Sequence, residues 1–343
     1  MPFTLSHAAA VLPAVRGDGR GRAGLVPSVL VAGSFAPDLP YFAASVVPGG
    51  MEFGAVTHSL AGVVGVDVLI AWTLVAVWLL VREPLVALLP RARQGRPAAL
   101  LRCGAPRARV RAVSVARWYG CAVLGALTHV GWDAFTHHDR WGSRVIPALG
   151  EDLAGMPLYT WLQYGSSALG ALVVALFWVR ALRRVPAGEP VGVPALSPGD
   201  RWRAGAVIGG CATAGAVLRT ARWWEHRSGA VRLWELVPTL CFGAGAGLLL
   251  GVLLYAAGVR LRRPDGLPAG VRDGVRGGAA VGVRDGVPVG VPEGAAVRVP
   301  DGAPDGLGGR SGRPGGPEGP RGPVRVARPG GTAGGERDRS GAR

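Results

Sequence analysis

Long apolar segments constrain the fold of this chain more than any other feature. Residues 59–81 carry one charged side chain, Asp67, and further apolar segments cover residues 118–130, 165–179, 204–218 and 236–259. About 20 mostly apolar residues suffice for a helix to cross a bilayer, and lipid forces such a segment to satisfy its own backbone hydrogen bonds. The sequence therefore predicts an all-α, polytopic membrane protein with about five membrane-associated helices. Residues 118–130 form the shortest of them and are expected to be partly interfacial.

The composition divides the chain into two parts near residue 260. Upstream, residues 25–42 are apolar but interrupted by prolines, which predicts a helix and a turn packed on the membrane body. Downstream, the chain becomes rich in glycine, proline and arginine and loses its apolar periodicity. Such a segment cannot bury enough apolar surface to offset the entropy of ordering. We predict a helical membrane domain over residues 1–260 and a disordered tail over residues 261–343.

The strong positive charge gives little information about partners. The net charge is +16, yet all 38 basic residues are arginine, which is typical of a GC-rich coding sequence. No basic stripe interleaved with aromatic residues and no helix-turn-helix or zinc-finger spacing is found, so we expect membrane lipid and no nucleic acid as a partner. Arginines are more frequent in the loops at 82–117 and 183–203 than on the opposite side. This bias favours a plasma-membrane protein with those loops and the tail in the cytoplasm.

Polar residues gather at the end of one apolar segment, in the sequence THVGWDAFTHHDRWG at 128–142. His129, Asp133 and His137 are spaced by four residues each, so on a helix they fall within an arc of roughly 80°. A histidine and a carboxylate one turn apart can hold one metal ion between them. Because His137 lies about 6 Å further along the axis, its position also suits a second ion bridged by Asp133.

The order of the apolar segments brings further histidines to the same face. His58 precedes the first span and His129 ends the second, so both lie on one side of the membrane whichever way the chain inserts. The predicted metal ligands are His7, Asp38, His58, His129, Asp133 and His137, with zinc as the expected ion because imidazole and carboxylate suit it. The alternative is that these histidines are interfacial side chains and Trp132 and Trp141 belong to an aromatic belt.

The four cysteines predict neither a disulfide framework nor a thiolate site, because they are scattered along the chain, at Cys103, Cys121, Cys211 and Cys241.

Several motifs together resemble an uncharacterised family of bacterial membrane proteins, domain of unknown function 4184. They are MPFTLSHAAAVLP at the start, then VAGSFAPDLPYF, THSL, THVGWDAFTH and LQYGSSALG, and the resemblance covers about residues 1–260. The ordered set of His, Pro-Asp, His and His-x3-Asp-x3-His is also distantly similar to inner-membrane metal-dependent hydrolases and to the zinc-dependent phospholipase C and P1 nuclease superfamily.

That second likeness implies a helical phosphoesterase core and a specific role for one carboxylate. It implies that the six residues named above bind metal and that Asp38 is also catalytic, orienting the attacking water. The superfamily's further His-x3-Glu pair is missing after His138, so one or two ions are predicted rather than three. Two functions remain open: a zinc-dependent hydrolase acting on a phosphoester or related ester at the membrane face, and a non-catalytic membrane protein whose His/Asp cluster is structural or a relic.

Overall fold

The computed structural model describes residues 4–103, 105, 112–138, 140–226 and 233–262, with the side chains of the last helix described from residue 236. All of these residues belong to one compact unit, which alone is described below. The predicted tail, 261–343, lies outside the described residues except for its first two positions, which end the last helix.

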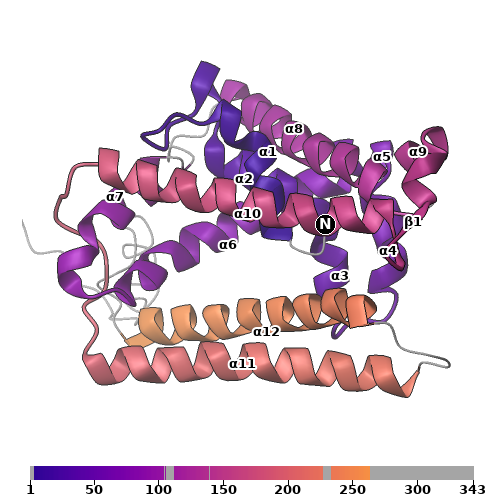
Figure 1. Cartoon of the computed structure of the whole chain (residues 1–343). Coiled ribbons are helices and arrows are strands. Elements are labelled where there is room, and N and C mark those ends of the chain that lie inside the picture. Colours follow the sequence, from indigo (N-terminus) through magenta and orange to yellow (C-terminus); the bar gives the residue numbers. More distant parts are fainter. Residues whose placement is uncertain (1–3, 104, 106–111, 139, 227–232, 263–343) are drawn as a thin grey trace, which may run out of the picture. The chain divides into compact units, whose positions relative to one another are not determined.

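The described residues are almost entirely helical, which confirms the predicted all-α class (Figure 1). Within the described ranges, the only strands are the short β1 (Asp152–Leu153) and β2 (Met156–Pro157), which pair antiparallel. The α-helices are α1 (Ala8–Val11), α2 (Pro27–Phe35), α3 (Leu39–Ala43), α4 (Gly50–Thr57), α5 (Leu60–Val64), α6 (Val66–Ala87), α7 (Gly95–Cys103), α8 (Ala112–Thr136), α9 (Trp141–Val145), α10 (Leu158–Arg184), α11 (Pro198–Glu225) and α12 (Leu233–Arg262). The 3-10 helices are η1 (Thr4–His7), η2 (Leu12–Ala14), η3 (Arg22–Gly24), η4 (Ala36–Asp38), η5 (Arg91–Arg93) and η6 (Pro147–Gly150).

Four described helices are long and apolar enough to cross a membrane. They are α6, α10, α11 and the part of α12 from Leu236 to Arg262, and they contain the predicted segments at 165–179, 204–218 and 236–259 and most of 59–81. The first predicted segment is broken at Gly65, which separates α5 from α6. The remaining predicted segment, 118–130, forms the middle of α8, and α8 is not among the four candidate membrane-spanning helices. Its last turns carry polar side chains, among them His129 and Asp133, and these lower its hydropathy.

The main core cluster lies where α2 packs against α6 and α8. Its fully buried members include Leu30 from α2, Ala71 from α6 and Ala122 from α8. Two glycines let α2 and α8 approach closely: a Cβ at Gly33 would lie 2.4 Å from the Ala122 oxygen, and one at Gly125 would lie 2.3 Å from the Leu30 oxygen. This contact matters for function because Ser34 follows Gly33, and His129 lies one turn beyond Gly125.

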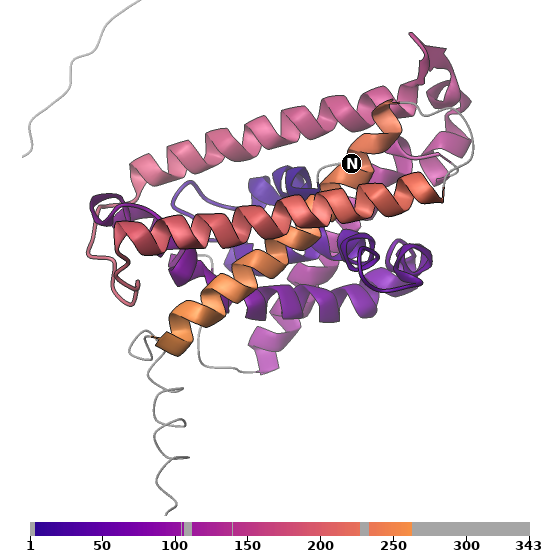
Figure 2. The same ribbon diagram turned by 90° about the horizontal axis from the view of Figure 1, so that it is seen from below.

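Helices α11 and α12 form a separate close pair. A Cβ at Gly215 would lie 2.3 Å from the Gly243 oxygen, and one at Gly247 would lie 2.0 Å from the Cys211 oxygen. Small residues commonly allow such backbone contact between helices in lipid. Figure 2 shows that α12 crosses α11 at an angle, so the two helices separate on either side of the glycine contact.

Candidate metal centre

Four side chains that could hold a metal ion, from three parts of the chain, meet in the interior. Asp38 ends η4, His58 caps the C-terminus of α4, and His129 and Asp133 lie one turn apart on α8. One ligand atom from each of the four lies within 4.8 Å of every other, and all four residues are buried. The structure therefore brings together four of the six predicted ligands, although they are up to 95 residues apart in sequence.

The spacing of the ligand atoms suits a small divalent ion. Nε2 of His129 lies 3.4 Å from both Asp38 Oδ1 and Asp133 Oδ2, and Nε2 of His58 lies 3.8 and 3.7 Å from the same two oxygens. In a tetrahedral zinc site with bonds of about 2.0–2.2 Å, neighbouring ligand atoms lie about 3.3–3.6 Å apart. These separations are too long for strong hydrogen bonds and close to those that four ligands of one ion would have.

Backbone carbonyls fix the tautomer of both imidazoles. Nδ1 of His129 lies 2.8 Å from the carbonyl oxygen of Ser34, and Nδ1 of His58 lies 2.8 Å from that of Gly54. A carbonyl oxygen can only accept, so each Nδ1 carries the proton it donates. This leaves the Nε2 lone pairs directed at the carboxylates. A metal-binding histidine is commonly held in this way by a hydrogen bond from its other ring nitrogen.

The buried Nε2 of His129 makes no hydrogen bond to any described residue. Buried polar atoms without a partner are rare in proteins and need an explanation. A bound cation provides one, because it would occupy the Nε2 lone pair in place of a proton.

A threonine orients the Asp38 carboxylate. The Thr4 hydroxyl donates a 2.6 Å hydrogen bond to Asp38 Oδ2, which leaves Oδ1 directed at the two imidazoles. Residues that hold a metal ligand in place commonly contribute 10- to 100-fold in metal affinity. We expect Thr4→Val, which keeps the side-chain shape, to weaken zinc binding by about that factor in competition with a chelating indicator dye.

Thr73→Val is the matched control for this prediction. The Thr73 hydroxyl donates to the Leu69 oxygen of its own helix and lies on an exposed surface, so the variant should bind zinc like the wild type. Equal zinc affinity in the Thr4 and Thr73 variants would exclude the orienting role of Thr4.

The remaining two predicted ligands, His7 and His137, lie beside Asp133 but outside the group of four. His7 stacks on His129 with ring centroids 3.7 Å apart, and its Nε2 lies 3.5 Å from Asp133 Oδ1. His137 Nδ1 lies 3.6 Å from Asp133 Oδ2, and its side chain is 35% exposed. Its other ring nitrogen lies 2.9 Å from the side-chain nitrogen of Gln163 on α10. Asp133 thus contacts every histidine of the site, and His137 marks the edge that water reaches.

The charges of the site favour a cation. Asp38, His129 and Asp133 lie outside the four candidate spans. Burial by itself would raise the pKa of Asp38, but His129 outweighs it and holds that pKa at about 2, and the pKa of Asp133 is also held well below its usual range. Burial opposes a charge on His129, yet the two carboxylates raise its pKa to about 10, so without a metal ion Nε2 would also carry a proton. Two carboxylates that stay ionised in the interior need positive charge beside them, which either the protonated His129 or a bound cation in place of that proton would supply.

Four residues that the sequence analysis did not assign to the site also lie in it. They are Thr4 and Gln163, described above, and Tyr41 and Arg140. Tyr41 has its ring centroid 5.6 Å from that of His58, and its phenol interacts with the Arg140 guanidinium. Burial raises the pKa of Tyr41, an effect that Arg140 partly offsets. These residues have no distinctive spacing, and only the fold shows that they face the cluster.

Together, the fold and the site define a class: an α-helical protein with membrane-spanning helices and a buried His/Asp group that could hold a metal ion. The chain belongs to the family described as a domain of unknown function, DUF4184, whose model matches residues 1–257. The predicted family membership is thereby confirmed. No curated protein and no solved structure was found to match the chain.

Proposed function

We propose that this protein is a membrane-embedded, metal-dependent hydrolase of a phosphoester or related ester, with zinc held by Asp38, His58, His129 and Asp133. The observation that carries the proposal is the pair of imidazoles whose Nδ1 atoms bond to backbone carbonyls and whose Nε2 atoms face two carboxylate oxygens. A bound zinc ion would lower the pKa of a water molecule and so supply a nucleophile at neutral pH. The plasma membrane remains the expected location, with the tail in the cytoplasm.

The edge of the site near His137 supports a reaction at the membrane surface. Gln163, which contacts His137, lies in the second turn of α10, a candidate span. A substrate reaching His137 from this side would approach at the end of a membrane helix, where lipid headgroups lie. Arg140, beside Tyr41, offers the planar donors that bind phosphate oxygens well. Asp38, fixed by Thr4, remains the carboxylate proposed to orient the attacking water.

The second candidate, a non-catalytic metal site, is favoured by a different observation. Four protein ligands close the coordination of a tetrahedral zinc ion, as in structural sites, whereas catalytic sites keep one position open. His129, Asp133 and Asp38 are each at most 3% exposed. The two candidates therefore differ in whether a substrate reaches the ion.

A variant that leaves the metal ligands intact separates the two. We expect Arg140→Gln to reduce kcat/KM on nitrophenyl phosphate monoester and diester probes by about 100- to 1,000-fold, as loss of one charge-stabilising group commonly does, with zinc content unchanged. Arg144→Gln, at an exposed position on the following short helix, is the matched control and should retain full activity.

Removal of the metal is the complementary measurement. Chelator should abolish hydrolysis, and added zinc should restore it. If zinc-loaded wild-type protein in lipid nanodiscs hydrolyses neither probe nor any phospholipid above background, the hydrolase is excluded and the non-catalytic site remains.

A further inference from the structure

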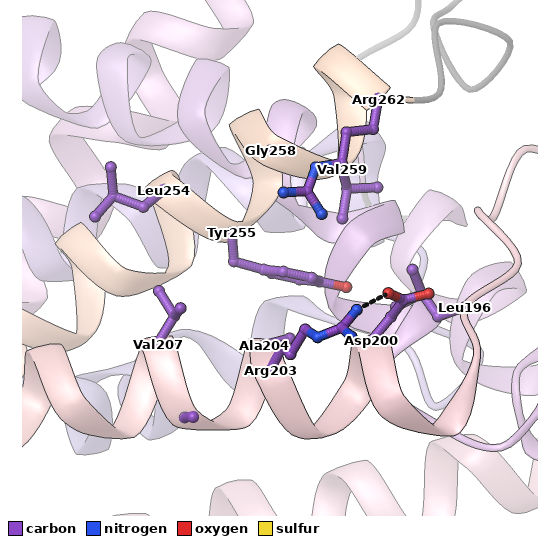
Figure 3. Close-up of a pocket in the computed structure, with 11 residues that line it drawn as sticks. Leu196, Asp200, Arg203, Ala204, Val207, Leu254, Tyr255, Gly258, Val259 and Arg262 are labelled. Atoms are coloured by element: carbon purple, nitrogen blue, oxygen red, sulfur yellow. Dashed lines mark hydrogen bonds and ion pairs between the residues drawn. The ribbon is translucent and has the colours of Figure 1, made fainter.

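A second site of quite different chemistry lies between α11 and α12. The two helices separate beyond their glycine contact and border a partly open cavity of about 680 Å³ (Figure 3). Its walls are largely apolar and include Leu196, Val207, Leu254 and Val259. A volume of this size is typical of a small-molecule site, and both of its main walls are candidate membrane spans.

Two arginines give one end of the cavity a positive charge. Arg203 comes from α11 and Arg262 from the end of α12, and Figure 3 shows Tyr255 between them in that view. Within the part of the chain that the structure describes, Arg262 has no hydrogen-bond or ion-pair partner. Arg203 pairs with Asp200 at 3.3 Å, but its side chain is 78% exposed. Such an exposed ion pair contributes little, so Arg203 can turn to another anion at low cost.

The one carboxylate in the lining does not offer a site for a cation. Asp200 accepts hydrogen bonds from the backbone nitrogen and the hydroxyl of Ser197, the residue that caps α11. The Asp200 carboxylate is therefore already engaged, by hydrogen bonds in the helix cap and by the ion pair with Arg203. The cavity consequently presents an excess of positive charge and no free carboxylate for a choline or ethanolamine group.

We propose that this cavity binds an anionic phospholipid. The phosphate would lie between Arg203 and Arg262, and the glycerol with the first part of the acyl chains would occupy the apolar walls. The remaining chain length would follow the exposed apolar surface of α12, where Leu250 and Leu254 are each 53% exposed. Basic pockets between membrane helices are known to bind anionic headgroups on the cytoplasmic side, and arginine frequency predicts the cytoplasm at this end of the helices.

The lipid site is distant from the metal centre. Arg219, further along α11, donates hydrogen bonds to the Tyr41 carbonyl and to the Ser45 hydroxyl, next to the His/Asp cluster. Arg203 lies 16 residues earlier on the same helix, or about 24 Å along its axis. Tyr255, in the cavity wall, donates to the carbonyl of Pro84 near the C-terminal end of α6. The proposal therefore stands independently of the hydrolase.

The test counts lipid molecules that stay bound to the full chain. Protein is reconstituted in phosphatidylcholine vesicles with or without phosphatidylglycerol, extracted in mild detergent and measured by native mass spectrometry and thermal unfolding. We expect wild-type protein to retain one phosphatidylglycerol and to show a higher Tm in the mixed vesicles. The double variant Arg203→Gln/Arg262→Gln should lose retention by at least tenfold, and Arg180→Gln, an exposed arginine near the end of α10, should not.

A shape variant tests the cavity without changing its charge. A Cβ at Gly258 would meet no atom within 4 Å, so Gly258→Phe extends into the cavity without disturbing the helix contact. It should block lipid retention, while Gly209→Phe, equally open but outside the cavity lining, should not. Zinc content should be the same in all four variants.

Three results would overturn the proposal. The first is equal phosphatidylglycerol retention in the wild type and in Gly258→Phe. The second is equal retention of phosphatidylcholine and phosphatidylglycerol by the wild type. The third is full displacement of the lipid by millimolar glycerol phosphate, which would identify the occupant as a soluble phosphate compound.

Discussion

Replacing Asp133 by asparagine is expected to reduce bound zinc from about one ion per chain to background. Asp133 lies 3.4–3.7 Å from His58, His129 and His137 through Oδ2 and 3.5 Å from His7 through Oδ1. The amide keeps the size of the side chain but removes the negative charge and places N–H donors opposite imidazole lone pairs. Elemental analysis of the detergent-purified protein gives the zinc content directly.

The same variant should lose the stability that metal binding contributes. A ligand present at about 1,000 times its Kd stabilises the folded state by about 4 kcal/mol. The wild type should therefore unfold at a clearly lower temperature in chelator, whereas Asp133→Asn should unfold at the same temperature with and without it.

Asp152→Asn is the control for charge and size. Asp152 lies on the exposed β1 strand, so this variant should keep both its zinc and its response to chelator. Wild-type zinc content in Asp133→Asn would show that the cluster is not a metal site.

Placing leucine at Gly125 is expected to disrupt both the fold and the metal site. The first added atom would lie 2.3 Å from the Leu30 oxygen and 2.8 Å from the Ser34 nitrogen, and neither backbone atom can move aside alone. Helices α2 and α8 would have to separate. Such overpacking typically costs about 1–3 kcal/mol, and the separation would also break the hydrogen bond from His129 to the Ser34 carbonyl. We expect lower thermal stability together with weaker zinc binding.

Gly131→Leu is the matched control on the same helix. A Cβ at Gly131 meets nothing within 4 Å, so the change should be neutral or stabilising by up to about 1 kcal/mol, the difference in helix propensity. If Gly125→Leu unfolds at the wild-type temperature with its zinc retained, the α2–α8 contact does not position the site.

The membrane helices were predictable because their signal is local. Length and apolar composition alone place 165–179, 204–218 and 236–259 inside α10, α11 and α12. The break at Gly65 was not predicted. Residues 118–130 were expected to be partly interfacial, and they are not among the candidate spans. The break depends on one backbone conformation, and the exclusion of 118–130 depends on polar side chains that point into the protein instead of into lipid.

Part of the candidate metal site was also predictable from the sequence. The spacing of His129 and Asp133 predicts a shared helix face, and the order of the spans predicts that His58 comes to the same side. Asp38 precedes the first span and was therefore expected on the same side, but no local pattern gives its distance from His129. The contributions of Thr4, Ser34 and Gln163 come from contacts across 26 to 95 residues, which no local periodicity encodes.

X-ray absorption at the zinc edge of the purified protein tests the central claim most directly. The proposed centre predicts about one zinc per chain, bound only to nitrogen and oxygen at about 2.0–2.2 Å, with the multiple-scattering signal of two imidazoles. Removal of His58 and His129 together should eliminate that signal. A protein without bound metal, or one with sulfur ligands at about 2.3 Å, would contradict a centre built from Asp38, His58, His129 and Asp133.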